Sequence, residues 1–410
     1  MKAEQLWLLG KLAKSYGDEL RKRGYKVNLI SDGPKKYKSI MPDNNVIADF
    51  SSKESLIRSL KKQSIKVDGV LTQGFENYVL PSAWLAEYYN VPGLSEEAAL
   101  VATDKTLMRQ KFIEYDATIT PEFTELFEWE TAEKFAQTHQ FPLILKPAHL
   151  AKSLLVTKNS NLIELRENYN HAQKILTEIY RKYAVKGRQP KMLVEEYLDG
   201  SAHSIDAVID QKQRIQLLEI VDYVVGYEIG IKDNFHFARL LPSRLTPDMQ
   251  NKVKTVAEKG IKALDLRSSP AHIEIIITKD GPKIIEIGAR AGGYRVRMYQ
   301  EANGIDYFTA IFDTAIGKSS KLVKTKNNFC AVLEVFPKKD GILKVIKGLD
   351  RLKENSATVY VRKINQIGDQ VGLAKNGYKA VLIVMLVSNN KQKFFDCYNY
   401  VKDQLEIVTT

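Results

Sequence analysis

The sequence has few cysteines and no long apolar run, and each shortage excludes a class of protein. Cys330 and Cys397 are the two cysteines in 410 residues, too few for a disulfide framework, and this fits a reducing, cytoplasmic location. No apolar stretch approaches the roughly 20 residues that a membrane-spanning helix needs. The apolar residues 6–9 are too few for a signal peptide. We therefore expect a globular chain without membrane contact, long enough for several folding units.

An excess of acidic residues is also missing, because the formal net charge is +12. The lysines are spread along the chain and often stand beside acidic residues, as at residues 338–340. No basic stretch is interleaved with aromatic residues as in RNA-binding motifs. This distribution favours a solvated basic surface that also attracts anionic substrates, and it argues against a nucleic-acid partner.

The first 95 residues alternate short strands and helices, which is typical of a parallel α/β sheet. The pattern predicts strands over 6–10, 25–30 and 67–72, and helices over 11–24 and 78–89. Gly24 stands where a glycine commonly ends a helix. The motif G-x-G-x-x-G does not follow the first strand, so this unit need not bind a dinucleotide.

The rest of the chain divides into a mixed segment, a strand-rich segment and a smaller α+β segment. Further helices are predicted over 95–101, 104–115, 161–184, 247–264 and 391–404. Further strands are predicted over 143–146, 191–197, 203–210, 214–225, 271–278, 283–288, 330–336, 357–364 and 379–387. This division predicts four domains, over residues 1–95, 96–190, 191–322 and 323–410.

The most informative local feature is a hairpin predicted from strands 271–278 and 283–288. A three-residue turn over 279–281 places Glu274 directly opposite Glu286, and alternation puts Ile284 on the same face as Glu286. Two carboxylates in that relation repel each other unless a cation lies between them. Mg²⁺ often uses one or two carboxylates together with substrate phosphates. Two interpretations of this glutamate pair remain: a metal site, or a solvated face of the sheet.

Arg290 follows this hairpin and precedes Ala291, Gly292 and Gly293. A guanidinium beside a magnesium–phosphate site stabilises the charge on a transferring phosphoryl group. Glycines let backbone N–H groups approach an anion closely, although the same run also occurs in ordinary turns.

Five segments in order resemble the ATP-grasp superfamily: Thr103-Asp104-Lys105, Leu143 to Pro147, Val194 to Gly200, His272-x-Glu274 and Glu286 to Arg290. Asp68-Gly69-Val70, Glu76 and residues 91–95 resemble its pre-ATP-grasp domain and the exit from it, so the resemblance covers about residues 1–320. It implies a fold of mixed α/β and α+β class, namely an ATP-grasp fold with an N-terminal Rossmann-like domain and a small C-terminal α+β unit. The implied cofactors are ATP and Mg²⁺ or Mn²⁺.

The resemblance implies a nucleotide site built from several segments. Lys105 and Lys146 would neutralise the phosphates as point charges, with Lys146 also catalytic, and Ser153 would lie in the loop that covers them. The residues expected to hold the adenine and the ribose are Glu195, Glu196, Tyr197, Leu198 and His203. Structural roles remain open as alternatives, such as exposed lysines or a buried, hydrogen-bonded histidine.

The resemblance assigns Glu274 and Glu286 to the metal ion, and Arg290 to catalysis at the γ-phosphate and the acyl phosphate. The residues expected to face the substrates are Arg290, Gly292, Gly293, Arg295 and Glu76. Arg295 and Arg297 would bind a substrate carboxylate, and a surface segment with two solvated arginines is an equal alternative.

Three features depart from the family's pattern. The loop over 149–156 lacks the usual glycines and keeps only Ser153, which puts its backbone contacts to phosphates in doubt. Gly288 stands where an asparagine usually provides a metal ligand, and Ala202 stands where a glutamate often contacts the ribose.

Residues 286–293 most resemble the L-amino-acid (dipeptide) ligases. This resemblance implies an ADP-forming acid–amino acid ligase that joins a carboxylate to an amine through an acyl phosphate. The expected partners are small-molecule carboxylate and amine substrates, and a homodimer is compatible with the sequence. Two alternatives remain: a carboxylase of the same superfamily that uses bicarbonate, and an inactive relative that binds nucleotide or nucleic acid.

Overall fold

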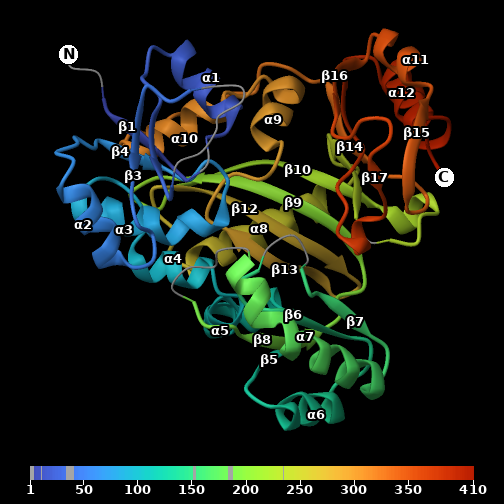
Figure 1. Ribbon diagram of the computed structural model, residues 1–410, viewed down its shortest axis with the longest axis horizontal. Helices are drawn as coiled ribbons and strands as arrows, with labels where there is room; N and C mark the ends of the chain where they lie inside the picture. Colours follow the sequence, from blue (N-terminus) through green and yellow to red (C-terminus); the bar gives the residue numbers. More distant parts are fainter. Residues whose placement is uncertain (1–3, 11, 34–40, 151–153, 183–187, 234) are drawn as a thin grey trace.

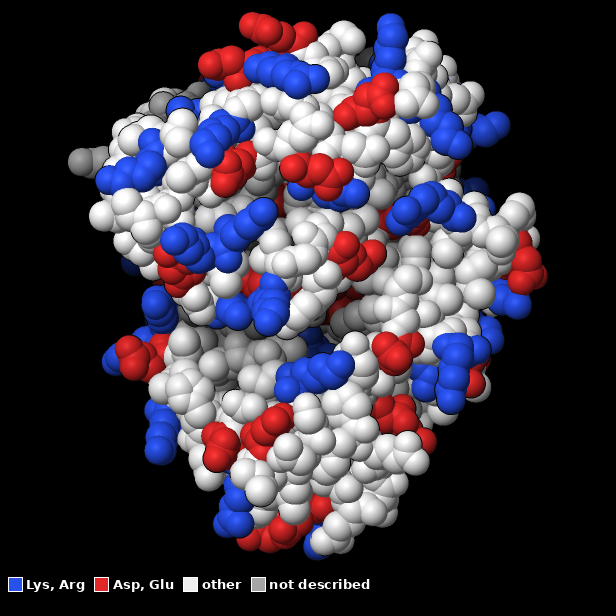
Figure 2. Space-filling model, turned by 90° about the vertical axis from the view of Figure 1, so that its right-hand side faces the viewer, with Lys and Arg blue, Asp and Glu red and all other residues white. Residues whose placement is uncertain are grey.

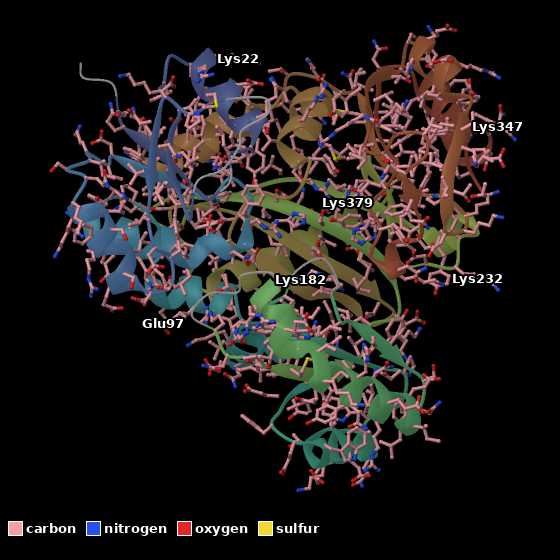
Figure 3. The ribbon with its side chains drawn as sticks, viewed as in Figure 1. Lys22, Glu97, Lys182, Lys232, Lys347 and Lys379 are labelled. Carbon is pink, nitrogen blue, oxygen red and sulfur yellow. The ribbon has the colours of Figure 1, made fainter. Side chains whose placement is uncertain are left out.

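The computed structural model describes the whole chain except residues 1–3, 11, 34–40, 151–153, 183–187 and 234. Figure 1 shows a large twisted sheet with the N-terminal unit and the C-terminal unit at its two ends and a smaller lobe below. Within the described part, no helix combines the length and the apolar character needed to cross a membrane. Figure 3 shows the labelled lysines Lys22, Lys182, Lys232 and Lys347 in well-separated parts of the molecule. All four are exposed, as expected for a solvated basic surface.

The N-terminal unit is a parallel sheet flanked by helices, as the alternating pattern predicts. Its four strands have the order β3-β2-β1-β4. The strands are β1 (Leu6–Leu9), β2 (Asn28–Ser31), β3 (Asn44–Ile47) and β4 (Gly69–Leu71), and the helices are α1 (Lys14–Lys22), α2 (Lys53–Lys61) and α3 (Val79–Tyr89). Gly24 adopts a φ of +78° just after α1, a conformation that favours glycine. Sequence analysis missed β3 and α2, because only one of the four residues of β3 is buried.

A smaller lobe follows the connecting helices α4 (Glu96–Ala102) and α5 (Lys105–Asp116). Its four-stranded sheet has the order β5-β8-β6-β7. The lobe consists of β5 (Phe123–Leu126), α6 (Trp129–Thr138), β6 (Leu143–Pro147), β7 (Thr157–Asn159), α7 (Leu162–Lys182) and β8 (Met192–Glu196). Leu143, Leu145 and Val194 of the sheet pack against Leu165 and Leu176 of α7. This core fixes the strands that carry Lys146 and Glu195.

The central sheet has eight strands in the order β13-β12-β9-β10-β11-β14-β18-β16. Its first five strands are β9 (Ser201–Ile209), β10 (Ile215–Val225), β11 (His236–Leu241), β12 (Ser269–Thr278) and β13 (Gly281–Gly288). Helix α8 (Pro247–Ala263) packs on one face, while α9 (Arg295–Asn303) and α10 (Tyr307–Ala315) pack with the N-terminal unit. Thr246 caps α8 by accepting from the N–H of Met249, and Pro247 opens the helix.

The C-terminal strands continue this sheet. β14 (Phe329–Val335) pairs with β11 and with β18 (Leu382–Ser388), and β16 (Thr358–Lys363) forms the far edge. The other elements are β15 (Gly341–Lys347), α11 (Leu349–Glu354), β17 (Gln370–Val371), α12 (Lys391–Asp403) and β19 (Glu406–Thr409). The α+β composition of this segment is therefore as predicted, whereas the four domain boundaries remain predictions.

In the hairpin of β12 and β13, Glu274 pairs with Glu286 as predicted, but the turn is shorter than predicted and one strand contains a bulge. Thr278 pairs with Gly281, so the turn between the strands is two residues long and not three. A bulge at Ile285 supplies the extra residue, and Glu274 therefore still pairs with Glu286. The predicted face of Ile284 is wrong for the same reason. Ile284 is fully buried under α8, where a Cβ on Gly260 would come within 2.4 Å of its terminal methyl group.

Candidate active site

The paired carboxylates Glu274 and Glu286 form the centre of the site. Glu286 Oε1 lies 3.2 Å from Lys105 Nζ, at the N-terminus of α5. Glu274 Oε1 lies 3.4 Å from Nε2 of His272, whose Nδ1 lies 2.7 Å from Asp206 Oδ1. Burial opposes ionisation of Glu274, but the hydrogen bond from His272 lowers its pKa well below the usual range. His272 therefore favours the ionised form of Glu274, and Lys105 places a cation beside Glu286.

These residues fit a metal ion that arrives with phosphate oxygens. Two carboxylates directly across a hairpin need a cation near them, and oxygen ligands suit Mg²⁺. The described residues contain no group of three or more metal-ligating side chains placed around one point. At Gly288, a Cβ would come within 3.2 Å of both Arg290 and Glu76. The space beside Gly288, where the family pattern has an asparagine, is therefore occupied by an ion pair.

That ion pair joins the large sheet to the N-terminal unit. Arg290 Nε donates to Glu76 Oε2 at 3.0 Å. The other oxygen of Glu76 is buried and has no hydrogen-bond partner among the described residues. Burial raises the pKa of Glu76, and the Arg290 guanidinium counteracts this effect. The arrangement leaves one carboxylate oxygen available for a further cationic group.

A hollow beside Glu76 has an apolar wall. Its lining residues are Phe50, Glu76, Asn77, Leu80, Pro81, Trp84, Thr103, His149 and Arg188. The apolar members come from the N-terminal unit, and Arg188 and His149 come from the smaller lobe. From the side shown in Figure 2, a separate view of the molecule, a hollow is visible between the smaller lobe and the body, with charged side chains of both signs on its rim.

Lys146 lies in a second, more deeply buried charge cluster. Its Nζ donates to Glu195 Oε1, and Glu195 Oε2 accepts from Arg109 Nε at 3.1 Å. Burial lowers the pKa of Lys146 to about 8, although the Glu195 carboxylate opposes the shift. Glu195 is thus engaged by two cations, whereas its predicted role was at the adenine. The sequence analysis missed Arg109, which lies one helical turn after Lys105 on α5.

The loop expected to cover the phosphates is anchored at its start. Lys105 Nζ donates to the carbonyl of Leu150 at 3.0 Å. His149 Nε2 lies 3.0 Å from Asp104 Oδ2, and its Nδ1 lies 3.1 Å from the hydroxyl of Tyr180. Asp104 also caps α5 by accepting from two backbone N–H groups. Ser153 lies outside the described residues, so its predicted role stays a prediction.

The glycines after Arg290 have separate surroundings. The N–H of Gly292 donates to Asp206 Oδ2 at 2.9 Å, so it is already engaged by a carboxylate of the protein and is not free for a substrate anion. A Cβ at this position would come within 2.4 Å of the His272 ring, which explains the glycine sterically. Gly293 is exposed. Of the two predicted glycines, only Gly293 is open to solvent.

The two arginines of α9 differ sharply in environment. Arg295 is 1% exposed, and its Nη2 donates to Ser204 Oγ and to the Tyr223 hydroxyl, both at 2.9 Å. Arg297 is exposed, stacks over Tyr360 and pairs with Glu301 at 3.7 Å. The structure therefore places Arg295 in the polar network behind the site and Arg297 on the surface.

The predicted adenine and ribose residues do not form one group. Glu196 accepts from the N–H of Glu122 at 3.0 Å, the Tyr197 ring lies 3.7 Å from Lys158 Nζ, and Leu198 is half-buried. His203 pairs with Ile275 across β9 and β12, on the face that packs against α8. Its ring is held by Asp222 at 2.9 Å and Ser201 at 2.8 Å. Because Ser204 and Asp206 face the other way, the structure separates His203 from the glutamates.

Comparison with known proteins connects this fold to a family. Residues 139–323 match the ATP-grasp domain. The L-amino acid ligase from Bacillus licheniformis superposes with a TM-score of 0.83 at 19% identity, over 100% of both chains. N5-carboxyaminoimidazole synthetase from Staphylococcus aureus, complexed with ADP, superposes with a TM-score of 0.73 at 15% identity, over 98% of this chain and 97% of that one.

A curated relative agrees with this connection. Alanine–anticapsin ligase from Bacillus subtilis is 25% identical over 304 residues, which are 68% of this chain and 64% of the relative. The chain thus spans less than two-thirds of that relative's length. The family match over residues 139–323 and the shared architecture confirm the predicted ATP-grasp fold.

Proposed function

We propose that the protein is an ADP-forming ligase that joins the carboxylate of one amino acid to the amine of another through an acyl phosphate. The observation that carries this proposal is the convergence of Glu274 and Glu286 with Lys105 and the Arg290–Glu76 pair. The similarity to ligases of amino acids supports the choice of substrates.

Each residue would serve one need of carboxylate activation. When bound, ATP with Mg²⁺ supplies a transferable phosphoryl group, and the ion neutralises the charge that develops during transfer. Glu274 and Glu286 would hold the ion, and Lys105 and Lys146 would draw the phosphates into the hollow. Arg290 would orient the substrate carboxylate and then the acyl phosphate. The amine would then attack the acyl carbon, and the carbon–oxygen bond to phosphate would break, releasing inorganic phosphate and a proton as the amide forms. The same cations would stabilise the intervening oxyanion.

Glu76 would recognise the ammonium group of the activated amino acid. Its unpartnered oxygen is buried beside Arg290, so a cation there would satisfy an otherwise costly group. The adjoining wall of Phe50, Leu80 and Trp84 would accept an apolar side chain. This arrangement supports an α-amino acid with a hydrophobic side chain as the activated substrate.

The direct test is phosphate release from Mg-ATP over a matrix of amino-acid pairs, with products identified by mass. The proposal expects ADP, phosphate and a dipeptide in equal amounts for at least one pair. Turnover that needs bicarbonate and no amino acid would replace it with the carboxylase hypothesis, which the fold also accommodates. Salt-sensitive binding of DNA or RNA without ATP turnover would replace it with the nucleic-acid hypothesis.

A further inference from the structure

Arg109 connects three elements of the site from a completely buried position. It lies on α5, and none of its side chain is exposed. Its Nε donates to Glu195 on β8 at 3.1 Å, and its Nη2 donates to the carbonyl of Ile285 on β13 at 2.6 Å. Its Nη1 is buried and has no hydrogen-bond partner among the described residues. One guanidinium therefore contacts both β8, whose Glu195 binds Lys146, and the hairpin of β12 and β13 that carries Glu274 and Glu286.

The hydrogen bond from Arg109 to β13 is made at the bulge of that strand. Ile285 is the bulged residue that shifts the register so that Glu286 faces Glu274. A bulge leaves backbone groups outside the regular ladder, and an unpaired buried carbonyl is costly. Arg109 satisfies the carbonyl of Ile285 and so supports the register on which the carboxylate pair depends.

The contact on β8 concerns the charge of Lys146. Glu195 gives one oxygen to Lys146 and the other to Arg109. If Lys146 turns toward a phosphate, Glu195 loses one cation but keeps Arg109. Without Arg109, the same movement would leave a buried carboxylate with no partner, a state that is strongly unfavourable.

We propose that Arg109 is a positioning residue that lets Lys146 exchange Glu195 for a nucleotide phosphate while holding the bulge beside Glu286. This inference rests on the proposed use of ATP and adds a residue that acts through Lys146 and β13. Arg109 itself neither contacts the substrates nor takes part in the transfer.

The test is the affinity for Mg-ADP, measured by calorimetry on the full chain at pH 7. Arg109→Met weakens binding by about tenfold to a hundredfold, because Lys146 can then leave Glu195 only at the cost of an unpaired buried charge. Lys111→Met removes a positive charge from the exposed side of the same helix and changes the affinity less than about twofold. Equal affinity of Arg109→Met and the unaltered protein overturns the proposal.

A second substitution distinguishes this role from simple packing. Glu195→Gln removes the carboxylate that retains Lys146, so Arg109→Met combined with Glu195→Gln binds Mg-ADP within about threefold of Glu195→Gln alone. A packing role predicts no such rescue, and its absence overturns the proposal.

Folding failure of Arg109→Met does not leave the question open. Arg109→Lys, which keeps a cation beside Glu195, then takes its place: it binds Mg-ADP within about threefold of the unaltered protein, and a larger loss of affinity overturns the inference. Failure of the unaltered protein to bind Mg-ADP is a separate outcome, because it overturns the proposed function as well.

Discussion

The site contains two lysine–carboxylate pairs of the same chemistry in different surroundings. Lys105 and Glu286 have side chains that are 10% and 24% exposed, whereas Lys146 and Glu195 are 5% and 7% exposed. Glu286 faces a second carboxylate, and Glu195 faces a second cation, Arg109. The first pair can therefore accept a metal ion beside its carboxylate, while the second already has its charges satisfied. The residue types alone do not distinguish these roles. The additional charged side chain beside each pair, Glu274 or Arg109, distinguishes them.

The largest expected difference between the pairs concerns Glu286. Glu286→Gln lowers phosphate release from Mg-ATP by at least about a hundredfold, because it removes a proposed metal ligand and the partner of Lys105. The melting temperature stays within a few degrees, since the side chain is partly exposed. Asp280→Asn, in the exposed turn of the same hairpin, is the control and retains activity. Full activity of Glu286→Gln would contradict the metal assignment.

Glu76 tests whether the cluster around Glu286 extends to the substrate. Glu76→Gln raises the KM for an amino acid by about tenfold to a hundredfold, because the buried carboxylate no longer meets the ammonium group. The KM for a carboxylate without an amino group changes much less. Steady-state kinetics with alanine and propionate separate the two cases, and Glu87→Gln, exposed on α3, is the control. An equal loss for both substrates would rule out ammonium recognition.

The more buried pair gives the site a dependence on pH. Lys146 has a pKa lowered by burial to about 8, so its charge is present below that pH and is lost as the pH rises through it. The affinity for Mg-ADP therefore decreases by up to about tenfold per pH unit above 8. Lys146→Arg keeps its charge at all these values and abolishes the decrease. Calorimetric titrations between pH 7 and 9.5 check this expectation, and an identical profile for both proteins would contradict it.

The smallest expected effect is at Arg297, which the sequence did not distinguish from Arg295. Arg297→Gln changes turnover less than about twofold, because its pair with Glu301 is exposed. Arg295→Gln, in contrast, leaves Ser204 and Tyr223 without their buried donor and lowers the melting temperature by several degrees. Thermal unfolding and phosphate release of the two variants provide the comparison.

The sequence predicted the hairpin well because its signal is local. Alternating isoleucines, a turn rich in polar residues and two glutamates in matching positions were enough to place Glu274 opposite Glu286. The same local rule gave the wrong face for Ile284. Alternation assumes an unbroken ladder, and the bulge at Ile285 depends on contacts from other elements, among them Arg109.

The sequence by itself determined most strands of the central sheet, the ATP-grasp resemblance and the two strands that carry Glu274 and Glu286, because these depend on short-range periodicity and on residue types. Only the tertiary structure decided the charge partners. It paired Glu195 with both Lys146 and Arg109, brought Glu76 from the N-terminal unit to Arg290, and turned His203 to the opposite face. These choices depend on burial and on contacts between residues far apart in the chain, which no local pattern encodes.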